Sequence, residues 1–338
     1  MKKNLIFSIV ALFLFFGCSK QSTDVTTPND GKYFTVKSGK IYTPEGSVFV
    51  PAGINAYYAN VNPGFKDAVA NSSCQPLLSL FPGVNIIRIN MAQYYAPSEI
   101  DQQIQWATTK GIVCIIEDHQ LGVLPYTGQQ LTDESAWYAQ WAAYYKNNPY
   151  VWFGTFNEPA PDYNNLSGNG QAISAQHQAT YNAVRNAGNG TIVTVQPSNP
   201  GTGQYLNTSV YKGMVNVVCE LHFYGWLVNY YNGYNSTDQN VNNGTLDKEI
   251  AEFQHQFTTA DGLPPVFIGE YGDSTSGTGI DYNSPQILNT VWYDAYPKGI
   301  GSAIWNWYYW RTTDNDIIQI NHQYSEMGQP FSNWLIYR

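Results

Sequence analysis

Two glutamates in this 338-residue sequence follow apolar, aromatic stretches and are candidates for paired carboxylate chemistry. Glu158 lies in VWFGTFNEP at residues 151–159, and Glu270 lies in PVFIGEYG at residues 265–272. Two carboxyls that face one pocket can cleave an acetal: one protonates the leaving oxygen and the other attacks the anomeric carbon. Nearby carboxyls titrate as a coupled pair, so one pKa is pushed upward. We therefore expect one of the two glutamates to hold a proton near neutral pH.

A cation beside one of the carboxyls would decide which of them stays ionised. If Arg88 lies beside Glu270, then Glu270 is the nucleophile and Glu158 is the acid and base, which holds the proton. Taken alone, each polar residue has an ordinary structural explanation, such as a helix cap, a salt bridge or a turn. Their shared position near the ends of apolar runs favours a common site. The other polar and aromatic residues at such ends are Glu117, Asp118, His119, Asn157, His222, Tyr224, Trp305 and Asn306.

Eight apolar, strand-like runs must position these residues. They lie at residues 48–56, 85–91, 112–119, 151–159, 191–198, 216–225, 265–272 and 301–310. Segments of helical period separate most of them, which predicts an α/β fold built as a single (β/α)8 TIM barrel. In such a barrel the carboxyl ends of all strands meet at one mouth. A doubly wound open sheet is the alternative, but the glycine-rich first turn that usually marks it is missing.

Several helices of the barrel can be placed from their apolar spacing. Ile100, Ile104 and Ala107 share a face after Pro97 and Ser98, a favourable helix start. The same spacing occurs at Trp137, Trp141 and Tyr144, at Leu246, Ile250, Phe253 and Phe257, and at Ile287 and Val291 after Pro285. The pattern is least regular after the first run, at residues 63–80, and after the fifth. A short N-terminal hairpin is predicted within residues 32–46, around two turns.

The composition narrows the class of partner. Only 12% of residues are charged and the net charge is -9, which argues against nucleic acid because its recognition needs clustered Lys and Arg. Aromatic residues reach 15%, and planar rings with polar edges suit neutral sugars. With Cys18 of the N-terminal segment set aside, the remaining cysteines are Cys74, Cys114 and Cys219. They are odd in number and widely spaced, so neither disulfides nor a zinc site is expected. Metalloprotease, acyl-transfer and phosphate-loop motifs are absent, and we expect no metal and no cofactor.

The N-terminus carries export signals. Residues 1–17 combine two lysines with an apolar run too short to span a bilayer, as in a signal peptide. Cys18 follows Phe15-Phe16-Gly17, which resembles a bacterial lipobox, so we expect a lipidated polar tether at residues 18–31 and a catalytic domain at residues 32–338. An ordinary secretory signal with an incidental Cys18 is the alternative. The expected location is the outer membrane or cell surface, or otherwise the medium.

The motifs in their order resemble glycoside hydrolase family five, the cellulase and mannanase family of retaining (β/α)8 enzymes, from residue 32 to the C-terminus. Asn157-Glu158-Pro159 after an aromatic strand and Glu270 in Ile-Gly-Glu-Tyr-Gly carry the likeness. The family's other motifs are matched by Arg88 in Asn-Ile-Ile-Arg, by Asp118-His119, by His222-Phe223-Tyr224 and by Trp305.

The resemblance implies a role for each matched residue. Glu158 would be the acid/base and Glu270 the nucleophile. Arg88 and Tyr224 would position and ionise Glu270, and Asn157 would hold the sugar 2-hydroxyl. The remaining matched residues, His119, His222 and Trp305, would line the sugar site, with a cis peptide usual after the position of Trp305.

The implied function is retaining, endo-acting hydrolysis of a neutral β-1,4-linked polysaccharide by a monomer. A cellulase-type endo-β-1,4-glucanase comes first, and an endo-β-1,4-mannanase or other β-glycanase is the alternative. A non-catalytic glycan-binding lipoprotein is the competing class. The presence of both carboxyls argues against it. Outer sugar subsites are expected at Tyr57-Tyr58, at Tyr94-Tyr95, in the tyrosine-rich loop 226–244 and at residues 307–310, where only some of the rings can face the cleft.

Overall fold

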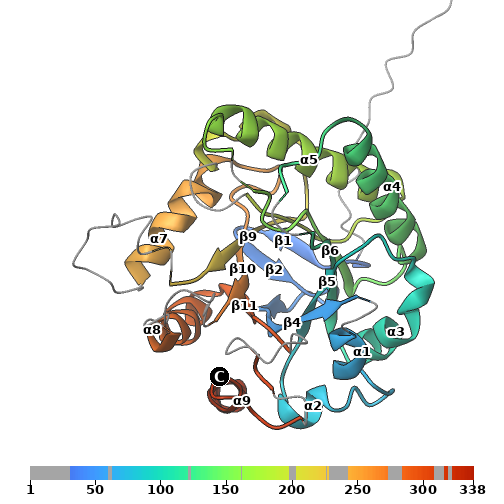
Figure 1. The fold of residues 1–338 in the computed structure, drawn as a ribbon, viewed down its shortest axis with the longest axis vertical. Helices are drawn as coiled ribbons and strands as arrows, with labels where there is room; N and C mark the ends of the chain where they lie inside the picture. The colour runs from blue at the N-terminus through green and yellow to red at the C-terminus, as the bar shows by residue number, and fades with distance from the viewer. Residues whose placement is uncertain are drawn as a thin grey trace, which may run out of the picture.

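The computed structural model describes residues 31–59, 63–120, 123–160, 162–197, 203–225, 227, 243–272, 284–307, 316–318 and 322–338. Its centre is a closed parallel barrel with the strand order β10-β11-β4-β5-β6-β7-β8-β9, ringed by helices (Figure 1). This confirms the predicted (β/α)8 barrel. The strands are β4 (Ala52–Tyr58), β5 (Ile86–Met91), β6 (Val113–Asp118), β7 (Val151–Gly154), β8 (Val193–Val195), β9 (Val217–Phe223), β10 (Val266–Tyr271) and β11 (Gly301–Ile304).

The first predicted run is divided between two sheets. β3 (Val48–Phe49) pairs with β2 (Lys40–Tyr42), which pairs with β1 (Thr35–Lys37), so the predicted hairpin is confirmed and gains a third strand. The barrel strand starts only at Ala52, because Pro51 between the two pieces has no N–H for a continuous ladder.

Alternation along each barrel strand divides the core into two. Outward side chains such as Val217, Cys219 and Leu221 of β9 pack in the main core beneath the helices. Inward apolar side chains such as Val218 form a second cluster at the start of the strands, where Phe34 and Ile41 from the small sheet join it. Nearer the carboxyl ends the inward positions become polar, which leaves the mouth of the barrel for charged groups.

The helices follow the barrel strands in order. They are α1 (Gly64–Ala68), α2 (Leu77–Leu80), α3 (Asp101–Thr109), α4 (Gly128–Tyr144), α5 (Leu166–Asn186), α7 (Asn243–Glu252), α8 (Ser284–Asn289) and α9 (Gly328–Tyr337). Short 3-10 segments are η1 (Pro97–Glu99), η2 (Gly203–Tyr205), η3 (Thr208–Tyr211), η4 (Gln254–Gln256) and η6 (Tyr296–Lys298), and η5 (Thr290–Ala295) is a π-helix. Within the described part of the chain, only η2 and η3 lie between β8 and β9, where the apolar pattern is irregular.

The apolar spacing identified the buried helix faces with one error. Ile100, Ile104 and Ala107 are fully buried, and the predicted residues of the later helical segments are buried as well. In α4, however, Tyr144 is 53% exposed. The buried face runs through Tyr138, Trp141 and Tyr145, so Tyr144 lies beyond its edge.

The predicted signal peptide, Cys18 and most of the tether fall within residues 1–30, outside the described residues. In the described ranges, no helix combines the length and apolar character needed to cross a membrane.

Candidate active site

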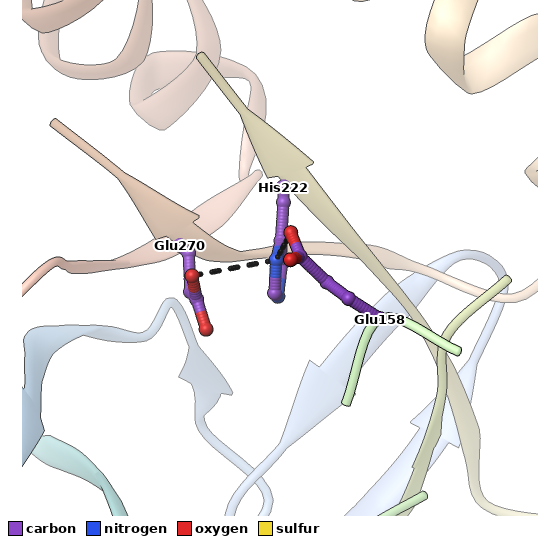
Figure 2. Close-up of side chains that lie close together, drawn as sticks. All are labelled: Glu158, His222 and Glu270. Atoms are coloured by element: carbon purple, nitrogen blue, oxygen red, sulfur yellow. Dashed lines mark hydrogen bonds and ion pairs between the residues drawn. The ribbon is translucent and has the colours of Figure 1, made fainter. Parts of the chain in front are cut away.

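The two candidate carboxyls meet at the mouth of the barrel, on either side of one histidine. An oxygen of Glu158, an oxygen of Glu270 and a ring nitrogen of His222 all lie within 4.8 Å of one another. Figure 2 shows Glu270 reaching the imidazole from β10 and Glu158 reaching it from the segment after β7. The side chains that the sequence placed at separate strand ends therefore form one cluster.

A β-bulge positions Glu270. The pairing of β10 with β9 shifts between Ile268↔Leu221 and Glu270↔His222, so Gly269 is the extra residue. Its carbonyl accepts a hydrogen bond from Asn55 Nδ2 at 2.7 Å. The bulge thus directs Glu270 toward the axis of the barrel, at the level of His222.

Glu158 lies beyond the end of its strand. The run at 151–159 was predicted as one strand, but β7 ends at Gly154. Glu158 has a φ of 38°, in the left-handed region, and its backbone N–H donates to Gln196 Oε1 at 3.3 Å. Its side chain is 25% exposed, whereas that of Glu270 is 6% exposed, so Glu158 is the more accessible of the pair.

Arg88 is buried beneath the pair and contacts three carboxylates. Its Nη1 lies 2.7 Å from Glu270 Oε1, its Nη2 lies 2.6 Å from Glu117 Oε2, and its Nε lies 2.6 Å from Glu220 Oε1. Nη2 also donates to Asn157 Oδ1 at 2.7 Å. Arg88 therefore lies beside Glu270, which is the condition under which Glu270 was expected to be the nucleophile.

His222 is the second cation of the site. Its Nδ1 lies 2.7 Å from Glu158 Oε1 and 3.5 Å from Glu270 Oε2, and its Nε2 lies 3.6 Å from Glu220 Oε1. Burial acts to lower the pKa of His222, but Glu270, Glu158 and Glu220 raise it to about 10. The ring is an imidazolium at neutral pH, with both nitrogens facing carboxylates.

The charge on His222 reverses the expected titration of the pair. Burial acts to raise the pKa of Glu158, but the His222 imidazolium overcomes it and holds that pKa below its ordinary value. Burial raises the pKa of Glu270, although His222 and Arg88 act in the opposite direction. The expectation that Glu158 itself holds the proton is therefore wrong for the free protein. That proton lies on His222, hydrogen-bonded to Glu158.

His119 and Trp305 form one wall of the site. Their rings stack with centroids 5.2 Å apart and an interplanar angle of 14°. His119 Nδ1 lies 2.6 Å from Glu117 Oε1, which leaves Nε2 for another partner. Burial lowers the pKa of His119 to about 3, so this ring is neutral. The peptide between Trp305 and Asn306 is cis, as the family resemblance implies.

The two remaining predicted residues also reach the cluster. Tyr224 donates its hydroxyl to Glu270 Oε2 at 3.1 Å. Asn157 uses its Oδ1 to accept from Arg88, and its buried Nδ2 has no hydrogen-bond partner. Asn157 is thus held in place with a free donor, as a residue that holds a sugar hydroxyl requires.

Four buried residues of the network were given no role in the expected site, although Glu117 was noted at the end of its apolar run. Asn90 Nδ2 donates to Glu117 Oε1 at 2.7 Å, and Asn55 accepts from Arg88 Nη1 at 3.0 Å. Glu220 lies beneath His222 on the same strand. The signal was present, because Asn55, Asn90, Glu117 and Glu220 are polar residues at inward positions of apolar strands.

The expected outer subsites are only partly supported. Tyr58 and Tyr95 are buried and pack against each other, whereas their neighbours Tyr57 and Tyr94 are more exposed. Trp307 is buried and donates its indole N–H to Asp67 at 2.8 Å, so it packs beneath the surface. Residues 308–310 and nearly all of loop 226–244 lie outside the described residues. Cys74, Cys114 and Cys219 are buried and carry free thiols.

Glu158, His222 and Glu270 are close enough together to be considered as metal ligands. In the described network His222 Nδ1 instead faces Glu158 at hydrogen-bond distance, in the manner of an N–H donor. The absence of a metal stays a prediction.

Comparisons with known proteins identify the family and the shared fold of this chain. The sequence model for cellulase, glycosyl hydrolase family 5, matches residues 82–311, which include every predicted site residue of the barrel. No curated protein sequence matches the chain.

Solved structures of low sequence identity share the fold. A β-glucanase from Saccharophagus degradans in complex with cellotetraose has 18% identity and a TM-score of 0.68, over 90% of this chain and 93% of that one. A β-mannanase from Streptomyces thermolilacinus with mannohexaose has 16% identity and a TM-score of 0.65, over 90% and 94%. The catalytic domain of a Thermobifida fusca endoglucanase has 17% identity and a TM-score of 0.65, over 90% and 97%. The family model covers more than half of the sequence, and the chain therefore belongs to glycosyl hydrolase family 5, the cellulase family.

Proposed function

We propose that this protein is a retaining endo-β-1,4-glycanase in which Glu270 is the nucleophile and Glu158 the acid/base. One observation carries the proposal: Glu158 and Glu270 place carboxylate oxygens within 4.8 Å of each other, with Arg88 ion-paired to Glu270 at 2.7 Å. Retaining enzymes hold their carboxyls about 5–5.5 Å apart, whereas inverting enzymes separate them by about 6.5–9.5 Å to admit a water. The short separation favours attack by Glu270 itself.

The first step transfers the glycosyl group to the protein. One carboxylate oxygen of Glu270 forms a bond to the anomeric carbon as the glycosidic C–O bond breaks, and Glu158 donates a proton to the departing oxygen. Glu158 obtains that proton along its 2.7 Å hydrogen bond from His222. In the second step Glu158 removes a proton from water, whose oxygen bonds to the anomeric carbon as the bond to Glu270 breaks. The proton then returns from Glu158 to His222 along the same hydrogen bond.

The sugar at the cleaved bond would lie over the half-buried Trp305, with its 2-hydroxyl toward the unpartnered Nδ2 of Asn157. A hydrogen bond to this hydroxyl that strengthens in the transition state supplies part of the rate acceleration. Tyr224 and Arg88 hold the two oxygens of Glu270, which fixes the direction of attack.

The preferred substrate is a β-1,4-glucan, and β-1,4-mannan is the second candidate. The family's designation as cellulase supports the first, and the fold shared with a mannanase solved with mannohexaose supports the second. A non-catalytic glycan-binding role is disfavoured because both carboxyls are present and held by cations.

Two measurements test the proposal. Reducing-end release is assayed on carboxymethylcellulose, mixed-linkage glucan, xyloglucan and mannan, with Glu134→Gln as a control for loss of a buried carboxylate between α4 and α5. Proton NMR then identifies the first-formed anomer from a β-linked oligosaccharide. A first-formed β-anomer is expected, and a first-formed α-anomer would exclude a retaining mechanism. If no glycan is hydrolysed, the proposed activity is rejected in favour of the non-catalytic glycan-binding role.

Export and lipid anchoring are part of the same proposal, supported by the apolar N-terminal run and Cys18. We expect the full-length chain to partition into membranes and Cys18→Ser to release it. Recovery of both forms in the same soluble fraction would contradict the anchor.

A further inference from the structure

We propose that Glu220 is a positioning residue of the catalytic pair, which holds Arg88 and His222 where they meet Glu270 and Glu158. The inference rests on the proposed function of this site and assigns a role to a carboxylate that touches neither substrate nor reacting atoms.

The position of Glu220 follows from strand alternation. In β9 the side chains of Val218, Glu220 and His222 point into the barrel, while those between them pack under the helices. Val218 belongs to the second apolar cluster at the start of the strands, and His222 belongs to the catalytic cluster at the mouth of the barrel. Glu220 is 1% exposed between these two layers, where a carboxylate is costly unless it is paired.

Glu220 connects the two cations of the site. Its Oε1 lies 2.6 Å from Arg88 Nε and 3.6 Å from His222 Nε2. The other nitrogens of Arg88 are directed to Glu270 and Glu117, and Nδ1 of His222 is directed to Glu158. Each cation therefore has Glu220 on one side and a catalytic carboxylate on the other.

No described residue other than Glu220 lies within ion-pair distance of His222 Nε2, and this buried nitrogen has no hydrogen-bond partner. At 3.6 Å the contact is an electrostatic one rather than a hydrogen bond. Burial opposes ionisation of Glu220, but Arg88, His222 and Thr194 lower its pKa to about 2. Glu220 is thus an anion at every pH at which the site would work.

One further hydrogen bond and the absence of a side chain at Gly269 determine where the carboxylate of Glu220 lies. Thr194 Oγ1 on β8 donates to Glu220 Oε2. On the other side, a Cβ at Gly269 would lie 2.2 Å from Glu220 Oε1, so the bulge that positions Glu270 leaves room for Glu220 because its extra residue is glycine. The charged groups that surround Glu220 are Arg88 on β5, Glu117 on β6 and His222 on β9. Glu270 on β10 lies beside both cations, Arg88 and His222.

Neutralising Glu220 should change the catalytic groups in a defined direction. Without this anion the imidazolium of His222 is less favoured, so His222 should lose its proton at lower pH. Because that proton serves Glu158, the alkaline limb of kcat/KM should move to lower pH.

The test compares Glu220→Gln, Glu220→Asp and Thr194→Val with the control Glu134→Gln. For Glu220→Gln we expect the alkaline limb to move by about one pH unit or more, and kcat to fall about ten- to a hundredfold with little change in KM. Glu220→Asp, which keeps the charge, should restore most of the profile. Thr194→Val should shift it less and in the same direction. An unchanged pH profile in a folded Glu220→Gln variant would overturn the proposal.

A second measurement needs neither activity nor a stable glutamine variant. In protein labelled with ¹⁵N-histidine, the ring nitrogens of His222 should report a protonated ring well above neutral pH, and Thr194→Val should lower the midpoint. A His222 that titrates near its ordinary pKa would overturn the inference. If His222 titrates as expected but the protein has no glycanase activity, the proposed function is rejected and the role of Glu220 in holding the two cations is not.

Discussion

His222 Nδ1 lies 2.7 Å from Glu158 Oε1, so the proton that an acid catalyst needs is already on a hydrogen bond to that acid. The same nitrogen is 3.5 Å from Glu270 Oε2. A single imidazolium thus lies between the two carboxylates and reduces their mutual repulsion.

Replacing the nucleophile should abolish turnover without unfolding the protein. Glu270→Ala removes the group that bonds to the anomeric carbon, so kcat/KM should fall by at least about 10³-fold. Circular dichroism should show an intact fold, because the buried Arg88 retains Glu117 and Glu220 as partners. Turnover equal to that of the wild type would remove the assignment of Glu270.

Replacing the acid should matter only when the leaving group needs a proton. For Glu158→Ala we expect a loss of about 10²–10⁴-fold on polysaccharide. On a dinitrophenyl glycoside, whose leaving group departs as an anion, bond cleavage should proceed at a nearly normal rate in the first turnover. Equal losses of first-turnover rate on both substrates would show that Glu158 is not the acid.

The raised pKa of His222 predicts that stability falls at alkaline pH. His222 binds its proton more tightly in the folded protein, with a pKa of about 10 against an ordinary 6.5. The stabilisation is fully present below about pH 6.5 and is lost as the pH rises through about 10. Urea unfolding at several pH values should show this decline, and His222→Gln should flatten it. A wild-type stability that stays constant over this range would contradict the assigned charge.

Adding a methyl group at the bulge should displace Glu220. In Gly269→Ala the new Cβ would lie 2.2 Å from Glu220 Oε1, so we expect a loss of about 1–3 kcal/mol in the free energy of unfolding and a fall in kcat. Gly213→Ala is a matched control, because its Cβ would meet no atom within 4 Å. If both variants unfold at the same urea concentration as the wild type, the close contact at Gly269 is not real.

The sequence by itself determined the barrel and most of the residues at its mouth. Apolar runs and helical spacing are local patterns, and the parallel arrangement they imply brings strand ends together whatever the details of packing. Arg88, His119, Asn157, Glu158, His222, Tyr224, Glu270 and Trp305 could be identified in this way and by family resemblance.

Only the tertiary structure decided how the charges of the site are paired. The order and register of the strands place Glu220 between Arg88 and His222, and a bulge at Gly269 directs Glu270 toward them. The proton expected on Glu158 therefore lies on His222. A buried charge is governed by neighbours that are distant in sequence, at separations of a few ångströms, and spacing along the chain does not specify those separations.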